Sequence, residues 1–302
     1  MLESLRVSLM PLVLVVGSAA AQAQQTSLPN SIVGASASIG DRDREAIAGF
    51  ITHWSGVLAS GDPISVNDAR GEMISPARSP SATPIFLRAY SEAAVPALTT
   101  IASGNDPFRA INALQVARFL RSPEGVEVII ARVDPAGESN RAKRLVASGL
   151  LAEAITDAGM NPVQLDGTTR RLASLAAAEA DWMIMLQEME ALDAVANLRD
   201  VAAASVELAR QSQVRVLETA VARMKSDPQV VEAIYRTLLE LRNQLVRMNS
   251  SQRAAFSKAF APVFASIQSA AASGLATAPP NLKPTFEKTA EQAKVLANLT
   301  KG

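Results

Sequence analysis

Apolar residues along this chain recur at the spacing of α-helices. From residue 42 to 58 they lie three or four positions apart, at Ile47, Phe50, Ile51, Trp54 and Leu58. Such spacing places them on one face of a helix, where they can be buried together. No run of Val, Ile and Thr with period two is bounded by hairpin turns, as a strand would be. We therefore predict an all-α fold.

Four Asp-Pro pairs mark the starts of predicted helices. The Asp side chain can accept hydrogen bonds from the first turn of a helix, and the fixed φ of Pro suits the first helical position. The pairs are Asp62-Pro63, Asp106-Pro107, Asp134-Pro135 and Asp227-Pro228. Their recurrence predicts a series of helix-turn-helix units. Pro76, Pro80 and Pro84 predict a loop before the clearest of these units.

Two helical hairpins with similar turn and helix-start residues follow one another between Pro84 and Ile155. The second helix of the first hairpin carries its apolar residues within one arc, at Ala110, Ala113, Leu114, Ala117 and Leu120. Arg109 and Arg141 are 32 positions apart, and helical-hairpin repeats have periods of about 30 to 47 residues. This spacing predicts a repeat, with a generic pair of helical hairpins as the alternative.

The residues of the first hairpin resemble those of a HEAT repeat. Asp106-Pro107-Phe108-Arg109 is similar to the start of the second HEAT helix, in which a turn Asp precedes an apolar-Arg step. Val95-Pro96-Ala97-Leu98 is similar to the matching first helix. The layout recurs in the next hairpin around Asp134 and Arg141, although Asn140 stands where an apolar residue is expected.

This resemblance is best over residues 84–155, and it implies a HEAT-like α-solenoid of stacked helical hairpins. The second helices of successive hairpins would then line one face of a curved stack, and such stacks mostly bind other macromolecules on that face. The resemblance also implies that Arg109 and Arg141 pair with the turn residues Asp106 and Asp134.

Longer antiparallel helices are predicted in the second half of the chain, at residues 168–192, 198–224, 251–273 and 284–299. Two coiled-coil-like seams alternate spacings of three and four, one at Val214, Leu217, Val221 and Met224, the other at Val231, Ile234, Leu238, Leu241, Leu245 and Met248. Because Asp227-Pro228 separates the seams, we favour an antiparallel hairpin over one long helix. We expect HEAT-like repeats over residues 41–160 and longer hairpins over 161–302, which either continue the array or form a bundle.

Residues 1–23 have the features of a signal peptide. The apolar run Val7–Val16 has the length of a signal core, and Ala21-Gln22-Ala23 offers the small residues that a signal peptidase recognises. An uncleaved membrane anchor is the alternative, which Pro11 disfavours because it breaks a short apolar run. We expect an exported protein, periplasmic or secreted, that begins near Gln24.

The residues after this signal add two expectations. Residues 24–40 are Ser-rich and small, without a helical or strand period, and predict a flexible leader. No later stretch approaches the roughly 18 apolar residues of a membrane span, so we predict no membrane span in the mature chain.

The composition limits the chemistry that the chain can perform. It has 302 residues and no Cys, which excludes disulfides, thiolate catalysis and cysteine-bound zinc. Acidic and basic residues number 29 each, giving a formal net charge of zero, which disfavours a nucleic-acid partner. Apolar residues make up 48% of the chain but aromatic residues only 4%, which predicts closely packed helices built from small and aliphatic side chains.

Catalytic motifs are missing from the sequence. His53 is the only histidine, and no carboxylate stands three or four positions after it, so we expect a partly exposed structural residue rather than a ligand. There is no Gly-x-Ser-x-Gly elbow and no glycine-rich phosphate loop. Glu188 and Glu190 are two positions apart and should face different sides of a helix. We predict no catalytic, cofactor-binding or metal-binding residues and no cofactor, although a pair of distant carboxylates in a dispersed site stays open.

Basic residues gather on the second helices of the two hairpins. Arg118 and Arg121 accompany Arg109 on the first of these helices, and Lys143 and Arg144 accompany Arg141 on the next, with no acidic residue on either helix between 108–121 and 139–152. Arg118, Arg121, Lys143 and Arg144 are therefore the candidate partner-binding residues. The alternative is an ordinary solvated face.

These features favour an exported, non-catalytic helical repeat protein that acts as a protein-binding scaffold in the cell envelope. Two alternatives stay open. One is a structural helical protein that forms a homo-oligomer through the seams between Val214 and Met248, and the other is an enzyme with a dispersed site. Acids clustered around His53 would favour the enzyme, and a broad polar groove would favour the scaffold.

Overall fold

The computed structural model describes residues 26–301, and within this range the chain folds into thirteen α-helices without a strand. The all-α prediction is confirmed. The helices are α1 (Asn30–Val33), α2 (Asp41–Ser60), α3 (Pro63–Arg78), α4 (Pro84–Ser103), α5 (Pro107–Arg118), α6 (Pro123–Ile130), α7 (Arg141–Asp157), α8 (Pro162–Ala178), α9 (Trp182–Ala196), α10 (Ala203–Arg223), α11 (Val230–Arg247), α12 (Ser250–Gly274) and α13 (Lys283–Leu299).

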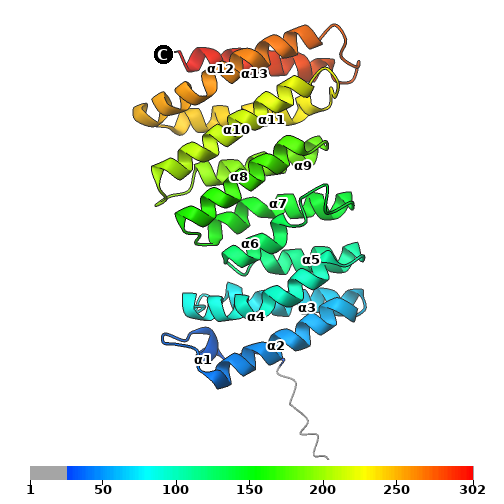
Figure 1. Ribbon diagram of the computed structural model, residues 1–302, viewed down its shortest axis with the longest axis vertical. Helices are drawn as coiled ribbons and strands as arrows, with labels where there is room; N and C mark the ends of the chain where they lie inside the picture. Colours follow the sequence, from blue (N-terminus) through cyan, green and yellow to red (C-terminus); the bar gives the residue numbers. More distant parts are fainter. Residues whose placement is uncertain (1–25, 302) are drawn as a thin grey trace, which may run out of the picture.

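From α2 onward, consecutive helices pair into hairpins that stack along the long axis of the molecule, from α2 at one end to α12 and α13 at the other (Figure 1). The second helices of the hairpins, α3, α5, α7, α9, α11 and α13, each contact the next in a continuous layer, which we call the second-helix layer. On the other side, α2, α4 and α6 contact one another in succession, as do α8, α10 and α12. Every helix thus packs mainly against neighbours close to it in the chain.

Two of the four Asp-Pro pairs begin helices as expected. The Asp62 side chain accepts hydrogen bonds from the backbone of Ile64 and Ser65 at the start of α3. Asp106 does the same for Phe108 and Arg109 at the start of α5. Each Asp satisfies two backbone N–H groups that have no partner inside the helix.

The other two Asp-Pro pairs do not begin helices. The side chain of Asp134 accepts from the backbone of Ala136 within a turn, and α7 starts only at Arg141. Its cap is Asn140, whose side chain accepts from the Lys143 backbone. Asn140, which departs from the apolar pattern of the sequence, is therefore explained by capping. Asp227 likewise caps no helix, because α11 begins at Val230 without a side-chain cap.

The helix expected over residues 168–192 is two helices. The first, α8, begins at Asn161-Pro162, where Asn161 and Gln164 form a reciprocal capping box. It ends at Ala178, and α9 starts at Trp182 with Asp181 as its cap. Apolar residues keep their helical spacing across the break between α8 and α9, so in the sequence only the cap of α9 marks the break.

Two expectations near the N-terminal end also differ from the structure. The segment 24–40, expected to be a flexible leader, contains α1, and Ile32, Val33 and Ile39 are buried against the core. Pro76, expected in a loop, lies inside α3 near its end. The predicted signal peptide, residues 1–23, lies outside the described residues.

The two seams are split as predicted, because α10 ends at Arg223 and α11 begins at Val230. Val231, Ile234, Leu238, Leu241 and Leu245 are all buried within this chain. Their seam is therefore occupied by helices of the same molecule, α9, α10 and α13 among them. Across residues 26–301, no helix combines the length and the apolar character that crossing a bilayer requires.

Candidate functional site

Polar side chains connect the turns inside successive hairpins. Arg109 on α5 donates from Nη2 to the carbonyl of Gly61 in the α2–α3 turn at 3.2 Å. Lys143 on α7 donates from Nζ to the carbonyl of Gly104 in the α4–α5 turn at 2.6 Å. Both contacts reach back one hairpin to a Gly that directly follows the end of a helix. They make a repeated link between neighbouring turns.

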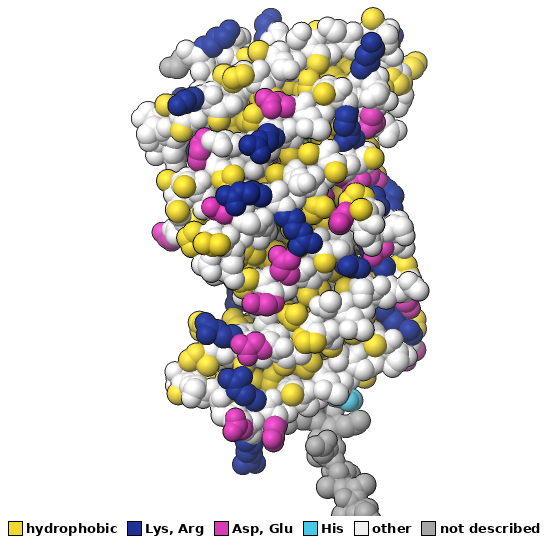
Figure 2. Space-filling view, viewed as in Figure 1, with side chains coloured by type: hydrophobic (Ala, Val, Ile, Leu, Met, Phe, Trp, Pro, Cys, Tyr) yellow, Lys and Arg dark blue, Asp and Glu magenta, His cyan; other side chains and the backbone are white. Residues whose placement is uncertain are grey.

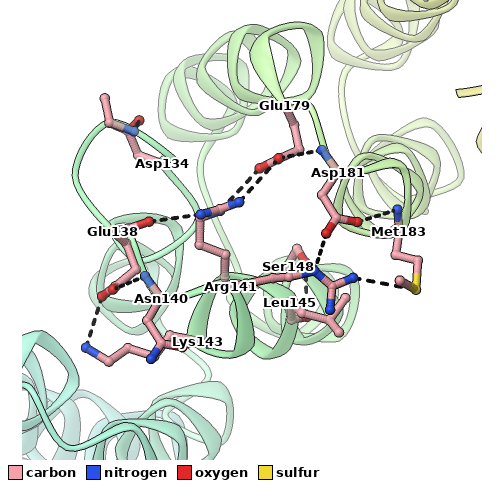
Figure 3. A network of polar contacts seen from close by, with 12 residues as sticks. Asp134, Glu138, Asn140, Arg141, Lys143, Leu145, Ser148, Glu179, Asp181 and Met183 are labelled. Atoms are coloured by element: carbon pink, nitrogen blue, oxygen red, sulfur yellow. Dashed lines mark hydrogen bonds and ion pairs between the residues drawn. The ribbon is translucent and has the colours of Figure 1, made fainter. Parts of the chain in front are cut away.

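The network continues through the loop between α6 and α7. Lys143 Nζ lies 3.1 Å from Oε2 of Glu138, and Arg132 lies 3.8 Å from the same oxygen. Burial raises the pKa of the Glu138 carboxyl, but the hydrogen bonds from the Asn140 backbone and Lys143 and the nearby cationic charges outweigh burial and leave the pKa lowered. The Glu138 carboxyl is therefore ionised, and the side chains of both Glu138 and Lys143 are buried. Figure 3 shows this pair on one side of α7.

On the other side of this loop, Arg144 joins α7 to the next hairpin. It donates to the Glu138 carbonyl at 3.1 Å and pairs with Glu179 in the α8–α9 turn at 3.4 Å. The Glu179 carbonyl in turn accepts from Arg223 at 2.6 Å, and Arg223 pairs with Asp227 at 2.9 Å. The contacts thus run through the turns of five successive hairpins, from α2–α3 to α10–α11, and we call them the turn network.

One of the two expected Asp–Arg pairs is present. Arg109 Nε lies 3.4 Å from Asp106 Oδ2, as the resemblance implied. Arg141 does not pair with Asp134 but with Asp181, the cap of α9 (Figure 3). Because Arg141 is the first residue of α7, it lies beside the turn of the following hairpin, while Asp134 is occupied in its own turn.

The four candidate partner-binding residues lie in different surroundings. Lys143 is only 4% exposed, and the Arg144 side chain is mostly buried in its pair with Glu179. Arg118 pairs with Glu153 on α7 and lies over the Phe119 ring. Arg121, just after α5, is exposed. Lys143 and Arg144 thus belong to the turn network. The four candidate residues do not form a continuous basic stripe exposed to solvent.

Glu188 on α9 is a buried acid without a hydrogen bond. It is 0% exposed, and neither carboxyl oxygen has a partner within the described residues. Burial, with the negative charge of Glu179, raises its pKa to about 9 even though Arg144 acts in the opposite direction. The side chain is therefore protonated at neutral pH. Glu190 is exposed, so the two glutamates face different sides of α9 as expected.

A second polar cluster lines a cavity of about 210 Å³ between α9, α10 and α11. Its carboxylates are Glu190, Asp193 and Glu240, and its other lining residues are Leu186, Met189, Gln213, Thr237 and Leu241. Glu190 and Glu240 are exposed, whereas the apolar residues and Gln213 are buried. The cavity therefore has a buried floor and an acidic rim. We call it the acidic cavity.

Amide side chains hold Asp193 in position in this cavity. Gln213 and Gln244 donate to its Oδ1 at 3.1 and 2.6 Å, and Asn197 donates to Oδ2 at 3.1 Å. Burial raises the pKa of Asp193 despite these hydrogen bonds. Burial also raises the pKa of Glu190, and the negative charges of Glu240 and Asp193 raise it further. The negative charge of neighbouring carboxylates in the cavity thus adds to burial in raising the pKa values of Glu190 and Asp193.

Asp193, Glu240 and Thr237 belong to no motif in the sequence and were not predicted as site residues. Glu190 and Asp193 are three residues apart, as are Thr237 and Glu240, and residues three apart share one face of a helix. This spacing is a usable signal on each helix separately. It does not show that α9 and α11 lie together, which depends on the stacking of the hairpins.

His53 is half-buried on α2, with its ring against Trp54 at a centroid distance of 4.7 Å. Within residues 26–301, no three His, Cys, Asp or Glu side chains are grouped so that they could hold a metal ion. This holds for the carboxylates of the acidic cavity as well.

No protein-family model and no curated protein matches this chain. Among solved structures, it is similar to the crystal structure of an engineered protein from the Northeast Structural Genomics Consortium. The two share 15% sequence identity over 82% of this chain and 97% of the engineered one, with a TM-score of 0.41. A similarity of this size carries no argument about function, which leaves the turn network and the acidic cavity as the features that bear on it.

Proposed function

We propose that this protein is a HEAT-like α-solenoid that acts as a non-catalytic, protein-binding scaffold in the cell envelope. The observation that carries the proposal is the order of helix contacts, in which each second helix packs on the next in an unbroken layer. Repeat proteins are built from such nearest-neighbour contacts, and they bind partners on the extended surface that the stack creates. The recurring link from Arg109 to Gly61 and from Lys143 to Gly104 supports a repeated unit.

The second-helix layer is the surface that we assign to the partner. Ile64 on α3 and Phe108 on α5 each follow an Asp-Pro pair, and their side chains are 75% and 41% exposed. Val246 on α11 is also exposed. Exposed apolar side chains at equivalent positions of neighbouring repeats are suitable anchors for a protein partner.

The charge on the surface fits a protein partner better than a nucleic acid. Figure 2 shows acidic and basic side chains interspersed over the face in view, with hydrophobic side chains between them. A nucleic-acid surface instead concentrates positive charge. Arg121 is exposed between α5 and α6, and it is the basic residue that we retain as a partner contact.

The experiment is a pull-down from the organism's own envelope fraction with the mature chain as bait. We compare wild type, the double variant Ile64→Ser with Phe108→Ser, and the control Val163→Ser, which removes an exposed apolar side chain from α8. The proposal expects a specific protein with wild type and the control and its loss with the double variant. Equal recovery with all three baits, or no specific protein with wild type, contradicts it.

Export is tested separately. We propose that the mature protein begins near Gln24, on the basis of the Ala21-Gln22-Ala23 site in the sequence. Intact-mass measurement on protein recovered from the envelope fraction should show the loss of residues 1–23. A mass that includes these residues argues for an uncleaved anchor instead.

A further inference from the structure

The acidic cavity concentrates negative charge that no ion pair within the described residues neutralises. None of Glu190, Asp193 and Glu240 forms an ion pair within residues 26–301. The side-chain hydrogen bonds that the Asp193 carboxylate accepts all come from neutral amide groups. Arg236 affects Glu190 through its charge, but its guanidinium lies over the Trp182 ring, 5.5 Å from the ring centre. The site is therefore complementary to a cation.

Thr237 provides an independent indication of a ligand. It is 6% exposed and lines the cavity, yet its Oγ1 has no hydrogen-bond partner among the described residues. The buried helical threonines Thr169 and Thr289 each donate to the carbonyl four residues earlier, both at 2.7 Å. Since a buried hydroxyl without a partner is destabilising, Thr237 leaves an unmet hydrogen bond in the wall of the cavity.

The apolar floor restricts the class of cation. Leu186 and Leu241 offer no ligand to a metal ion, Met189 offers only a thioether sulfur, and the carboxylates are not grouped to hold a metal. The apolar side chains of the floor suit an alkyl chain, whose transfer out of water is favourable. A cavity of about 150 Å³ is known to accept benzene, so 210 Å³ accommodates a short alkyl group.

We propose that the acidic cavity binds a protonated primary alkylamine, with the ammonium group among Glu190, Asp193 and Glu240 and the alkyl chain on the apolar floor. An ammonium has three N–H donors and no acceptor, which matches a site whose charged groups are all carboxylates. Such an amine has two sources, a free small molecule or the lysine side chain of a protein. The second source rests on the proposed scaffold function, because α9 and α11 belong to the second-helix layer.

The test is calorimetric titration of the mature chain with 1-aminopentane, with N-acetyl-lysine methylamide and with 1-pentanol as the uncharged control. Binding of 1-aminopentane without binding of 1-pentanol supports the proposal. If the lysine analogue also binds, the source is a protein lysine, and if it does not, the source is a free amine. No binding of 1-aminopentane, or equal binding of 1-pentanol, overturns the proposal.

Matched variants place the amine in the cavity. Glu240→Gln and Asp193→Asn each keep the shape of the side chain and remove its charge, and each should weaken 1-aminopentane binding at least tenfold. Thr237→Val should weaken it as well, because it removes the hydroxyl alone. Glu218→Gln, an exposed change on α10 outside the cavity, should leave binding unchanged.

Unfolding curves identify any variant that fails to fold, and such a variant is left out. Glu240→Gln is the variant least expected to disturb folding, because Glu240 lies at the exposed rim, and its result then decides the test. Undiminished binding in Glu240→Gln, or an equal loss in Glu218→Gln, contradicts the assigned site. Amine binding that persists while partner capture fails leaves this site intact and contradicts only the scaffold function.

Discussion

Lys143 Nζ lies 2.6 Å from the carbonyl oxygen of Gly104, a residue 39 positions earlier in the chain. The same ammonium is 3.1 Å from Glu138, so one buried lysine ties two hairpin turns together. A Lys side chain is almost never fully buried unless it is paired. Its position therefore depends on both contacts.

Replacing Lys143 by Met should destabilise the protein by about 3 kcal/mol, because breaking a buried pair leaves the remaining charge without its partner. Chemical denaturation monitored by circular dichroism measures the change in the free energy of unfolding. The control is Lys294→Met on α13, where the lysine is exposed and the change should stay within about 0.5 kcal/mol. Equal unfolding midpoints for the two variants would show that the buried network does not stabilise the fold.

Asp106→Ala should lower the free energy of unfolding by about 1 kcal/mol, since it removes the side chain that caps α5. Asp106→Asn retains an oxygen that can accept the same backbone hydrogen bonds, so its effect should be a few tenths of a kcal/mol. The two variants separate the cap from the ion pair with Arg109, because both lose the charge. If Asn and Ala are equally destabilising, the charge rather than the cap is what matters.

Glu188→Gln should change how stability depends on pH. The folded-state pKa of Glu188 is about 9, against an ordinary value of 4.5. Between these values the unfolded chain releases this proton and the folded chain keeps it, so the wild type loses stability as the pH rises through this window. For one group the slope is about 1.4 kcal/mol per pH unit at most.

The glutamine variant should lack this contribution, so its stability relative to wild type should increase from pH 5 to pH 8. Denaturant midpoints measured at several pH values for both proteins provide the comparison. Glu138 and Asp181 have lowered pKa values, so their contributions are lost as the pH falls below the ordinary range of a carboxyl and do not overlap with this window. Parallel curves for wild type and Glu188→Gln would refute the prediction.

Gly125→Ala should destabilise the protein because α6 packs closely on the end of α5. A Cβ at this position would lie 2.8 Å from the Ala117 carbonyl oxygen and 3.1 Å from Leu120 Cβ. Relieving such an overlap requires a backbone shift, with an expected cost of about 1 to 3 kcal/mol. Thermal unfolding should show the lower melting temperature.

Gly49→Ala on α2 is the matched control, since a Cβ there meets nothing within 4 Å. It should stabilise the helix by up to about 1 kcal/mol, because Ala has the higher helix propensity. A gain in stability from both substitutions would mean that the contact between α5 and α6 is looser than these distances imply.

Local patterns in the sequence determined the helices and many of the positions at which they begin and end. The spacing of Ile47 to Leu58 predicted α2, and the caps Asp62 and Asp106 were readable because a cap and the backbone it serves are two or three residues apart. The break near Asp227-Pro228 was predicted for a different local reason, because a proline disfavours the helical conformation of the residue before it. Helical period alone did not reveal the break between α8 and α9, because apolar residues continue on both sides of it.

Only the tertiary structure decided which side chains meet across the stack. Lys143 has the sequence context of a solvated charge, and Arg141 has two acidic candidates, Asp134 and Asp181, at different distances along the chain. The contacts of Lys143 with Gly104 and of Arg141 with Asp181, and the presence of Asp193 and Glu240 in one cavity, depend on how hairpins roughly 40 to 50 residues apart pack against one another. Helical periodicity specifies one face of one helix, whereas the free energy of burying that face selects the neighbour it is placed against.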